Sequence, residues 1–158
     1  MFVASGKAQT IAKEKQARQT VRAFVSVKYP AAGSKWLLDL VDGYRLTFKL
    51  NSYKYTARFS PEGEWIQTER SISLNDISSE ARRSFEATPY STAKMLSVKE
   101  QTFPKQPDTL YHIEVRYDKH NADESVTPED HKLYFTPSGL LTKDELEPDN
   151  SLPYLTWR

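Results

Sequence analysis

The stretch Phe59-Ser60-Pro61-Glu62-Gly63 decides the fold, because a stretch of the same kind, Phe135-Thr136-Pro137-Ser138-Gly139, follows it 76 residues later (135 − 59). Other apolar residues recur in the same order. Phe24 and Tyr29 return as Phe85 and Tyr90, and Tyr44, Leu46 and Phe48 return as Tyr111, Ile113 and Val115. Such recurrence indicates a duplicated unit. The difference in residue number between corresponding positions of the two copies increases only at residues 102–108 and 119–130. We expect these segments to be loops inserted in the second copy.

The first copy is predicted to hold one helix and four strands. Apolar residues at helical spacing indicate a helix that Pro30 ends, with Val21, Phe24, Val25 and Val27 on its inner face. Turn residues then separate strands at 35–40, 44–50, 53–59 and 64–69. The connections are too short for parallel pairing, so the strands form an antiparallel meander.

The second copy repeats this order. A helix is expected at 78–88, with Asn75 or Asp76 as its N-cap and with Ile77, Ala81 and Phe85 facing the core. Strands are expected at 94–100, 110–118, 131–136 and 140–143. The predicted fold class is therefore α+β, a tandem repeat of a helix plus a four-stranded antiparallel meander. The repeats span 20–70 and 78–145 within a domain of residues 20–146, and a tail of residues 147–158 follows.

Alternation along the strands predicts which face of the first sheet is buried, because successive side chains point to opposite faces. The apolar set is Tyr44, Leu46, Phe48, Leu50, Tyr53, Tyr55, Ala57 and Phe59. The opposite face carries a basic set, which is Arg45, Lys49, Lys54 and Arg58, with Thr47 and Thr56 between its members. We expect the helix to cover the apolar face and to leave the basic set in solvent.

The run from Tyr55 to Ile66, followed by Ile77 ahead of a helix and then by strand, turn and strand, resembles the bacterial PepSY-like family of β-lactamase-inhibitor-like proteins. The resemblance covers about residues 20–145. It implies an exported, noncatalytic protein whose sheet surface grips a partner, as the β-lactamase inhibitor protein grips its enzyme. The chain departs from that inhibitor because it lacks disulfides, and the family has no fixed inhibitory motif that would assign residues here.

Composition limits the function classes. The chain of 158 residues is long enough for one core without metal or disulfide staples. A formal net charge of +1 argues against a nucleic-acid binder, which must neutralise many phosphates. The absence of cysteine excludes thiolate metal sites and a cysteine nucleophile. No run of about 18 apolar residues occurs, so no transmembrane segment is expected.

The N-terminal segment, residues 1–19, is interpreted as the remnant of an export signal. Gly6 and Ala8, followed by Gln9, resemble the residues around a signal-peptide cleavage site. This interpretation predicts a periplasmic or secreted location. The alternative is a frayed cytosolic N-terminus, because the charged start and most of the apolar part of a signal are missing.

Sequence motifs for catalysis are missing. The chain has no Gly-x-Ser-x-Gly elbow for a nucleophile and no glycine-rich phosphate loop. Its three histidines, His112, His120 and His131, are interpreted as strand or loop residues. The acidic insert 118–124 and Glu129-Asp130-His131 could offer ligands to a cation, but the insert lacks the spacing and the glycine of an EF-hand and is interpreted as a solvated loop. We therefore expect no enzyme activity, no metal and no cofactor.

The predicted binding site consists of Arg45, Lys49, Lys54, Arg58 and Trp65. Trp65 is assigned to the basic face on the assumption that Ile66 and Thr68 share the buried face. The predicted function is recognition of a protein or peptide, with inhibition of an exported hydrolase or protease as one form of it. The alternative is a periplasmic receptor for a small or polymeric ligand. An open sheet with exposed aromatic residues would favour the first function, and a closed apolar pocket would favour the second.

Overall fold

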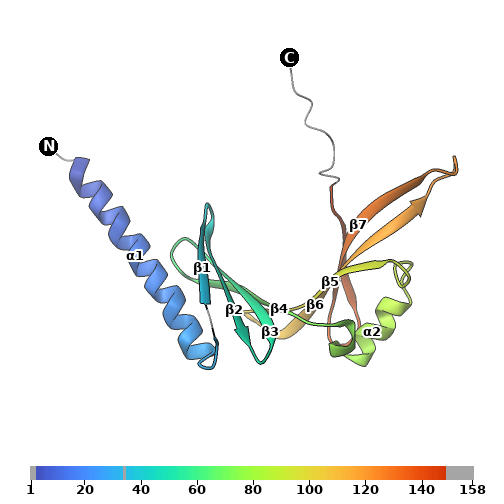
Figure 1. Ribbon diagram of the computed structural model, residues 1–158, viewed down its shortest axis with the longest axis horizontal. Coiled ribbons are helices and arrows are strands. Elements are labelled where there is room, and N and C mark those ends of the chain that lie inside the picture. The colour runs from blue at the N-terminus through green and yellow to red at the C-terminus, as the bar shows by residue number, and fades with distance from the viewer. Residues whose placement is uncertain (1–2, 34, 149–158) are drawn as a thin grey trace, which may run out of the picture. The chain divides into compact units, whose positions relative to one another are not determined.

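A computed structural model describes residues 3–33 and 35–148 of the chain (Figure 1). The predicted tail falls largely on residues 149–158, which lie outside the described residues. Two α-helices, α1 (Val3–Lys28) and α2 (Ser79–Glu86), are accompanied by the short 3-10 helix η1 (Leu74–Asp76). The strands are β1 (Lys35–Leu40), β2 (Gly43–Leu50), β3 (Tyr53–Phe59), β4 (Trp65–Ser71), β5 (Lys94–Phe103), β6 (Gln106–His120), β7 (Val126–Phe135) and β8 (Leu141–Leu146).

The eight strands are hydrogen-bonded in chain order, from β1 to β8, and the registered neighbours run antiparallel. An α+β fold with an antiparallel sheet is thereby confirmed. Contacts divide the chain into two compact units. Unit 1 ends at Ser71 and also includes Gln101–Thr109, whereas unit 2 consists of Ile72–Glu100 and the chain from Leu110 onward.

In unit 1, α1 covers the face of the meander that alternation predicts to be buried. Ala17, Val21 and Val25 of the helix are fully or almost fully buried. They belong to the same core cluster as Leu46 and Phe48 of β2, together with Tyr44, Ala57 and Phe59. Burial of apolar surface of this kind is the main stabilising term of the unit. The predicted buried face of β2 and β3 is therefore confirmed.

The helix α1 differs from its prediction in where it begins and in one residue of its inner face. It begins at Val3, well before the apolar stretch, and the side chains of residues 6–16 are exposed. Val27, which we expected on the inner face, has an exposed fraction of 83%. A residue two positions after Val25 is rotated by about 200° around the helix axis, which turns Val27 away from the sheet. The assignment of Val27 to the core was wrong.

In unit 2, α2 packs against the meander through the residues that its four-residue spacing predicted. Ile77, Ala81 and Phe85 are buried in one cluster with Val98, Tyr111, Ile113, Val115, Leu133 and Phe135. The N-cap of α2 is Ser78, whose hydroxyl accepts a hydrogen bond from the Ala81 N–H at 3.2 Å. The prediction of Asn75 or Asp76 was wrong, because the Asp76 carboxylate accepts from the Ser73 N–H at 2.8 Å and caps η1 instead.

The two Pro-x-Gly turns have the same construction in the two units. Gly63 and Gly139 both adopt a φ of 88°, a left-handed conformation that favours glycine. A Cβ at Gly63 would lie 2.8 Å from the Ala17 carbonyl oxygen of α1, and a Cβ at Gly139 would lie 2.7 Å from the Glu80 carbonyl oxygen of α2. Each turn thus fits against the helix of its own unit only because a side chain is absent.

The phenylalanine before each turn contacts the helix of its unit in the same manner. The rings of Phe24 and Phe59 meet edge to face at a centroid distance of 5.4 Å, and those of Phe85 and Phe135 do so at 6.4 Å. A register shift follows Arg58 in unit 1 and Tyr134 in unit 2. The two units therefore share a turn, an irregularity and an aromatic contact.

The two predicted insertions are not irregular loops. The segment 102–108 lengthens β5 and β6 into a hairpin that turns between Phe103 and Gln106. The segment 119–130 lengthens β6 and β7, which stay paired as far as His120 and Val126. Both inserts are thus mostly paired strand closed by a short turn, so the prediction of loops at these two places was wrong.

Candidate binding surface

The four basic residues predicted from alternation lie side by side on β2 and β3. Arg45 is directly opposite Arg58, and Lys49 is directly opposite Lys54. Between these pairs lies a third pair, Thr47 and Thr56. All four basic side chains are exposed. We refer to Arg45, Lys49, Lys54 and Arg58 as the basic stripe.

The arrangement of the basic stripe does not favour folding. Directly opposed residues of an antiparallel pair have Cβ atoms about 5 Å apart, and like charges at this distance are destabilising. Arg58 forms an ion pair with Asp42 in the β1–β2 turn, at 3.0 Å between Nη2 and Oδ2. Among the described residues, no ion pair joins Arg45, Lys49 or Lys54 to an acidic group. Three of the four charges of the stripe thus have no ion-pair partner in the described part of unit 1.

Trp65 does not lie beside the stripe, and its predicted placement was wrong. Arg58 is opposite Gln67 while Phe59 is opposite Trp65, so Ile66 is an extra residue in β4. This bulge reverses the alternation, because two residues of one strand face a single residue of the other. Trp65 therefore shares the face of Phe59, whereas Ile66 has an exposed fraction of 44%.

The surroundings of Trp65 are those of a residue of the core boundary. Its ring packs against Phe24 at a centroid distance of 5.1 Å, and the Lys28 ammonium lies 3.6 Å from the ring centroid. Its indole N–H donates to the Thr68 hydroxyl at 2.9 Å. Burial beside this ring lowers the pKa of Lys28. Trp65 thus anchors α1 to β4 behind the stripe.

The exposed aromatic residue of the outer face is Trp36, which our reading of the sequence missed. Trp36 lies opposite Thr47, and Leu38 lies opposite Arg45, so both share the face of the basic stripe. Their exposed fractions are 74% and 39%. Continuing the alternation of β2 through the turn at Val41 and Asp42 would have placed Trp36 on this face.

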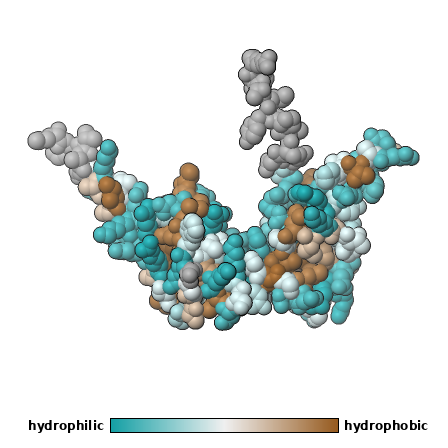
Figure 2. Space-filling model, in the orientation of Figure 1, coloured by the Kyte–Doolittle hydropathy of each residue, from teal (hydrophilic) through white to brown (hydrophobic). Residues whose placement is uncertain are grey.

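Apolar surface gathers around the β1–β2 hairpin, with hydrophilic residues around it (Figure 2). The hairpin contributes Trp36 and Leu38 on β1 and the fully exposed Val41 at the turn. An exposed aromatic side chain with charged neighbours is the composition found in protein recognition sites, where Trp and Arg carry much of the binding energy. The candidate surface consists of Trp36, Leu38 and the basic stripe.

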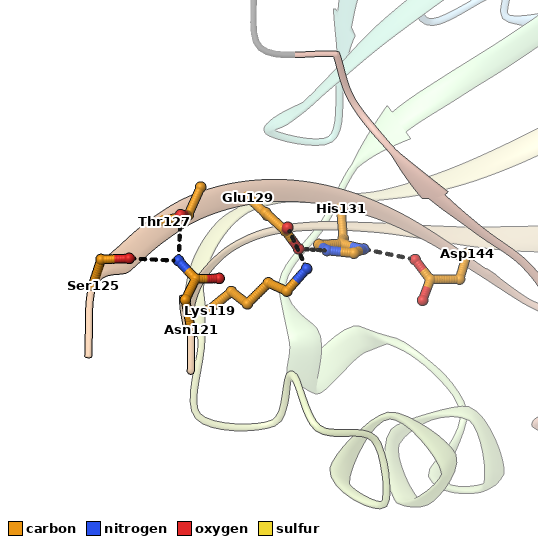
Figure 3. Close-up of polar contacts among 7 residues, drawn as sticks. All are labelled: Lys119, Asn121, Ser125, Thr127, Glu129, His131 and Asp144. Atoms are coloured by element: carbon orange, nitrogen blue, oxygen red, sulfur yellow. Dashed lines mark hydrogen bonds and ion pairs between the residues drawn. The ribbon is translucent and has the colours of Figure 1, made fainter. Parts of the chain in front are cut away.

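Unit 2 contains a second group of polar side chains, which centres on His131 (Figure 3). Its Nδ1 lies 2.9 Å from an oxygen of Asp144 on β8, and its Nε2 lies 3.2 Å from an oxygen of Glu129 on β7. Lys119 of β6 donates to the other Glu129 oxygen at 3.2 Å. Tyr90 donates to Asp144 at 2.9 Å. We refer to these five residues as the polar cluster.

The electrostatics of the polar cluster follow from these contacts. The hydrogen bond from His131 lowers the pKa of the Glu129 carboxyl, and Lys119 lowers it further. Burial raises the pKa of the Tyr90 phenol to about 12, with the Asp144 hydrogen bond acting in the same direction. An ionised carboxylate only accepts hydrogen bonds, so His131 donates to both carboxylates when both ring nitrogens carry a proton.

The geometry of the polar cluster suits packing better than catalysis. Both ring nitrogens of His131 face carboxylates, and its side chain is only 10% exposed. Within the described chain, His131 makes no hydrogen bond to a hydroxyl group that could act as a nucleophile. The imidazole also stacks on the Tyr90 ring at 4.5 Å. The cluster links β6, β7 and β8 to the segment after α2.

The acidic insert provides no evident cation site. In residues 3–33 and 35–148, no three His, Cys, Asp or Glu side chains are arranged to hold a metal ion. The polar side chains at the tip of the hairpin satisfy one another, since Asn121 donates to Ser125 and Thr127 at 3.0 and 2.8 Å. Ser125 in turn donates to Asp123. These bonds stabilise the turn that joins β6 and β7.

Comparisons with known proteins bear on the fold. No family model and no curated protein matches the chain. A solved BLIP-like protein from Bacteroides fragilis superposes with a TM-score of 0.68 at 18% identity, covering 87% of this chain and 93% of that one. A DUF2874 family protein from Bacteroides ovatus gives a TM-score of 0.67 at 23% identity, covering 80% and 85%.

A third structure, provisionally described as a periplasmic protein of Bacteroides eggerthii, superposes with a TM-score of 0.66 at 20% identity, covering 80% of this chain and 86% of that one. The chain has a BLIP-like fold. At these identities the likeness concerns the fold and assigns no residue a role. In the described part of the chain, neither helix is long and apolar enough to cross a bilayer.

Proposed function

We propose that this protein is a noncatalytic, exported bacterial binding protein that recognises an acidic or mixed-charge segment of another protein through the outer face of unit 1. The observation that carries the proposal is the basic stripe, whose like charges are directly opposed beside the exposed Trp36. Opposed like charges cost folding energy, and three of the four basic groups form no ion pair within the described part of the unit, so binding to a partner explains the arrangement better than stability does.

The BLIP-like fold supports a binding role, because the neighbour from Bacteroides fragilis is described as BLIP-like, that is, as similar to the β-lactamase inhibitor protein. An exported hydrolase or protease is therefore a reasonable partner to test first. The neighbour described as periplasmic supports a periplasmic or secreted location.

We further infer that the two units are a tandem repeat of a helix and a four-stranded meander, as in the PepSY-like family. The shared turn with a glycine at φ 88°, the register shift beside Phe59 and Phe135, and the edge-to-face contact of these rings with their helices support this inference. Nothing in the local chemistry of a turn requires these three features to occur together in both units. Duplication accounts for their recurrence.

The function is tested by nuclear magnetic resonance with a synthetic extended peptide of alternating glutamate and valine as the probe. We expect peptide-induced shifts in the Trp36 indole N–H and in the backbone amides of β2, while the Trp65 indole N–H stays unchanged. A peptide with lysine in place of glutamate is the matched control. Equal shifts with both peptides, or shifts confined to unit 2, would show that the basic stripe is an ordinary solvent-exposed surface and not a binding site.

The residues of the stripe differ from Trp36 in the kinetic step that they affect. Replacing Arg45 and Arg58 by glutamate should slow association strongly at low salt and less at high salt, because exposed charges steer the encounter. The Trp36→Ala change should raise the dissociation rate instead. The alternative function, a receptor for a small or polymeric ligand, would be favoured if the peptide failed to bind and sugars or other envelope components bound in unit 2.

A further inference from the structure

Among residues 3–33 and 35–148, β1 is at the end of the strand order and pairs with no strand other than β2, so its other edge has backbone groups that no described strand pairs. Proteins usually protect such an edge, because it can pair with a strand of another molecule. β1 carries two protective charges, Lys35 and the inward-facing Asp39, but it also exposes apolar side chains beside this edge. Four of its six residues are exposed, including Trp36 and Leu38.

The sequence of β1 is complementary to itself in one antiparallel register. If two copies pair about a twofold axis through Leu37, Lys35 of one copy lies opposite Asp39 of the other. The same register places Trp36 opposite Leu38 and Leu37 opposite Leu37. Opposite charges and apolar pairs at such positions are the units that stabilise antiparallel sheets. We propose that two copies of this chain form a dimer by pairing β1 with β1 in this register.

Other symmetric registers lack this complementarity. Centring the pair on Trp36 places Lys35 opposite Leu37, and centring it on Leu38 places Leu37 opposite Asp39. The other end of the sheet, β8, is less suited to self-pairing. Centring two copies on Asp144 would oppose this carboxylate to itself, and centring them on Lys143 would pair Leu141 with Glu145. Symmetric pairing is therefore specified best at β1.

The faces of β1 allow a second strand to approach. Leu37 and Asp39 share the face covered by α1, where Arg18 forms an ion pair with one oxygen of Asp39. The second carboxylate oxygen can accept from Lys35 of the other copy. Toward its N-terminus α1 diverges from β1 (Figure 1).

The basic stripes of the two copies do not prevent pairing. Three strand spacings separate β2 of one copy from β2 of the other, which is about 14 Å. Charges in solvent are screened beyond about 8 Å at physiological salt. The Lys35–Asp39 pairs, in contrast, would be in direct contact. The dimer would join two outer faces into one continuous surface, but its formation does not depend on the proposed function.

The test is a charge exchange between two variants of the full chain, measured by analytical ultracentrifugation. In a dimer of Lys35→Asp, two carboxylates face each other at both of the 35–39 pairs. In a dimer of Asp39→Lys, two ammonium groups face each other at both pairs. Each variant should dimerise at least about tenfold more weakly than the wild-type chain. An equimolar mixture should restore dimers to within about threefold of wild type, since both pairs are then complementary.

Two controls separate the register from other effects. Arg18→Ala removes the intrachain partner of Asp39 and should leave dimerisation within about threefold of wild type. Lys54→Asp makes the same change of net charge as Lys35→Asp, but on β3. Mixing Lys54→Asp with Asp39→Lys should therefore not restore dimers to the wild-type level. Circular dichroism checks that each variant is folded. A wild-type chain that stays monomeric up to about millimolar concentration, or a mixture that dimerises no better than its components, would overturn the proposal.

Discussion

The same place in the two units is filled by two different kinds of chemistry. In unit 1, Tyr29, Phe48 and Tyr55 form an aromatic stack, with ring centroids 5.0 to 5.6 Å apart. In unit 2, His131 occupies the position of Tyr55, since each lies four residues before the phenylalanine of its turn. Tyr90 packs on His131 as Tyr29 packs on Tyr55.

The residues on the neighbouring strands also differ between the units, and again the ionisable residue is in unit 2. Thr68 lies opposite Ala57 in unit 1, while the corresponding residue of unit 2, opposite Leu133, is Asp144. Unit 1 therefore closes this end of its core with apolar contacts, and unit 2 closes it with hydrogen bonds among ionisable groups. The comparison shows that one backbone arrangement tolerates either solution, provided that each buried polar group has a partner.

The largest expected effect tests what the two units share. Phe59→Ala and Phe135→Ala should each lower the free energy of unfolding by about 3–5 kcal/mol, because both rings are fully buried. Chemical denaturation measures the loss, and Val41→Ala at the exposed turn serves as a control. A loss below about 1 kcal/mol at one position only would show that the two turns are not equivalent.

The next effect tests what distinguishes the units. His131→Phe introduces an aromatic ring like that of unit 1 but removes one hydrogen-bond donor from Glu129 and one from Asp144, which keep Lys119 and Tyr90 as donors. We expect His131→Phe to lower the free energy of unfolding by more than the matched change in unit 1, because a buried hydrogen-bonded side chain is replaced by an apolar one between two carboxylates. Tyr55→Phe, the matched change in unit 1, should cost less than about 1 kcal/mol. Equal losses would mean that the polar cluster is no more than a second apolar contact.

A smaller effect should appear only at high pH. The pKa of Tyr90 is raised from 10.0 to about 12, so the folded state favours the neutral phenol. This contribution is fully present below pH 10 and is lost as the pH rises toward 12. The free energy of unfolding, measured by chemical denaturation, should therefore fall in this range, and Tyr90→Phe should reduce the fall. An unchanged profile in Tyr90→Phe would exclude Tyr90 as its source.

The smallest effect separates stability from binding on the outer face. Arg45→Glu replaces the like-charged pair with Arg58 by an opposite pair, so it should stabilise unit 1 by about 0.2–1 kcal/mol. The same change should weaken binding of the acidic peptide. Thermal unfolding and a titration with the peptide measure the two effects. If Arg45→Glu destabilised the unit, the basic stripe would have a structural purpose.

Local patterns were sufficient for much of the fold. The bounds of β1 and β3 match their predictions, and the buried face of β2 and β3 follows from alternation alone. A strand and its two faces depend on neighbouring residues, which a sequence displays directly. The core position of Phe85 likewise follows from helical spacing.

The position of Trp65 required the tertiary structure. Trp65 lies on the inner face because a one-residue bulge at Ile66 reverses the alternation, and the turn before it fits under α1 at Gly63. A bulge depends on how a turn packs against a distant helix, so alternation could not reveal it. The polar cluster is of the same kind, since Tyr90, His131 and Asp144 lie far apart in the sequence and meet only when the strands pair. The sequence by itself determined strands, faces and the basic stripe, and packing between distant segments decided that Trp65 does not lie beside that stripe.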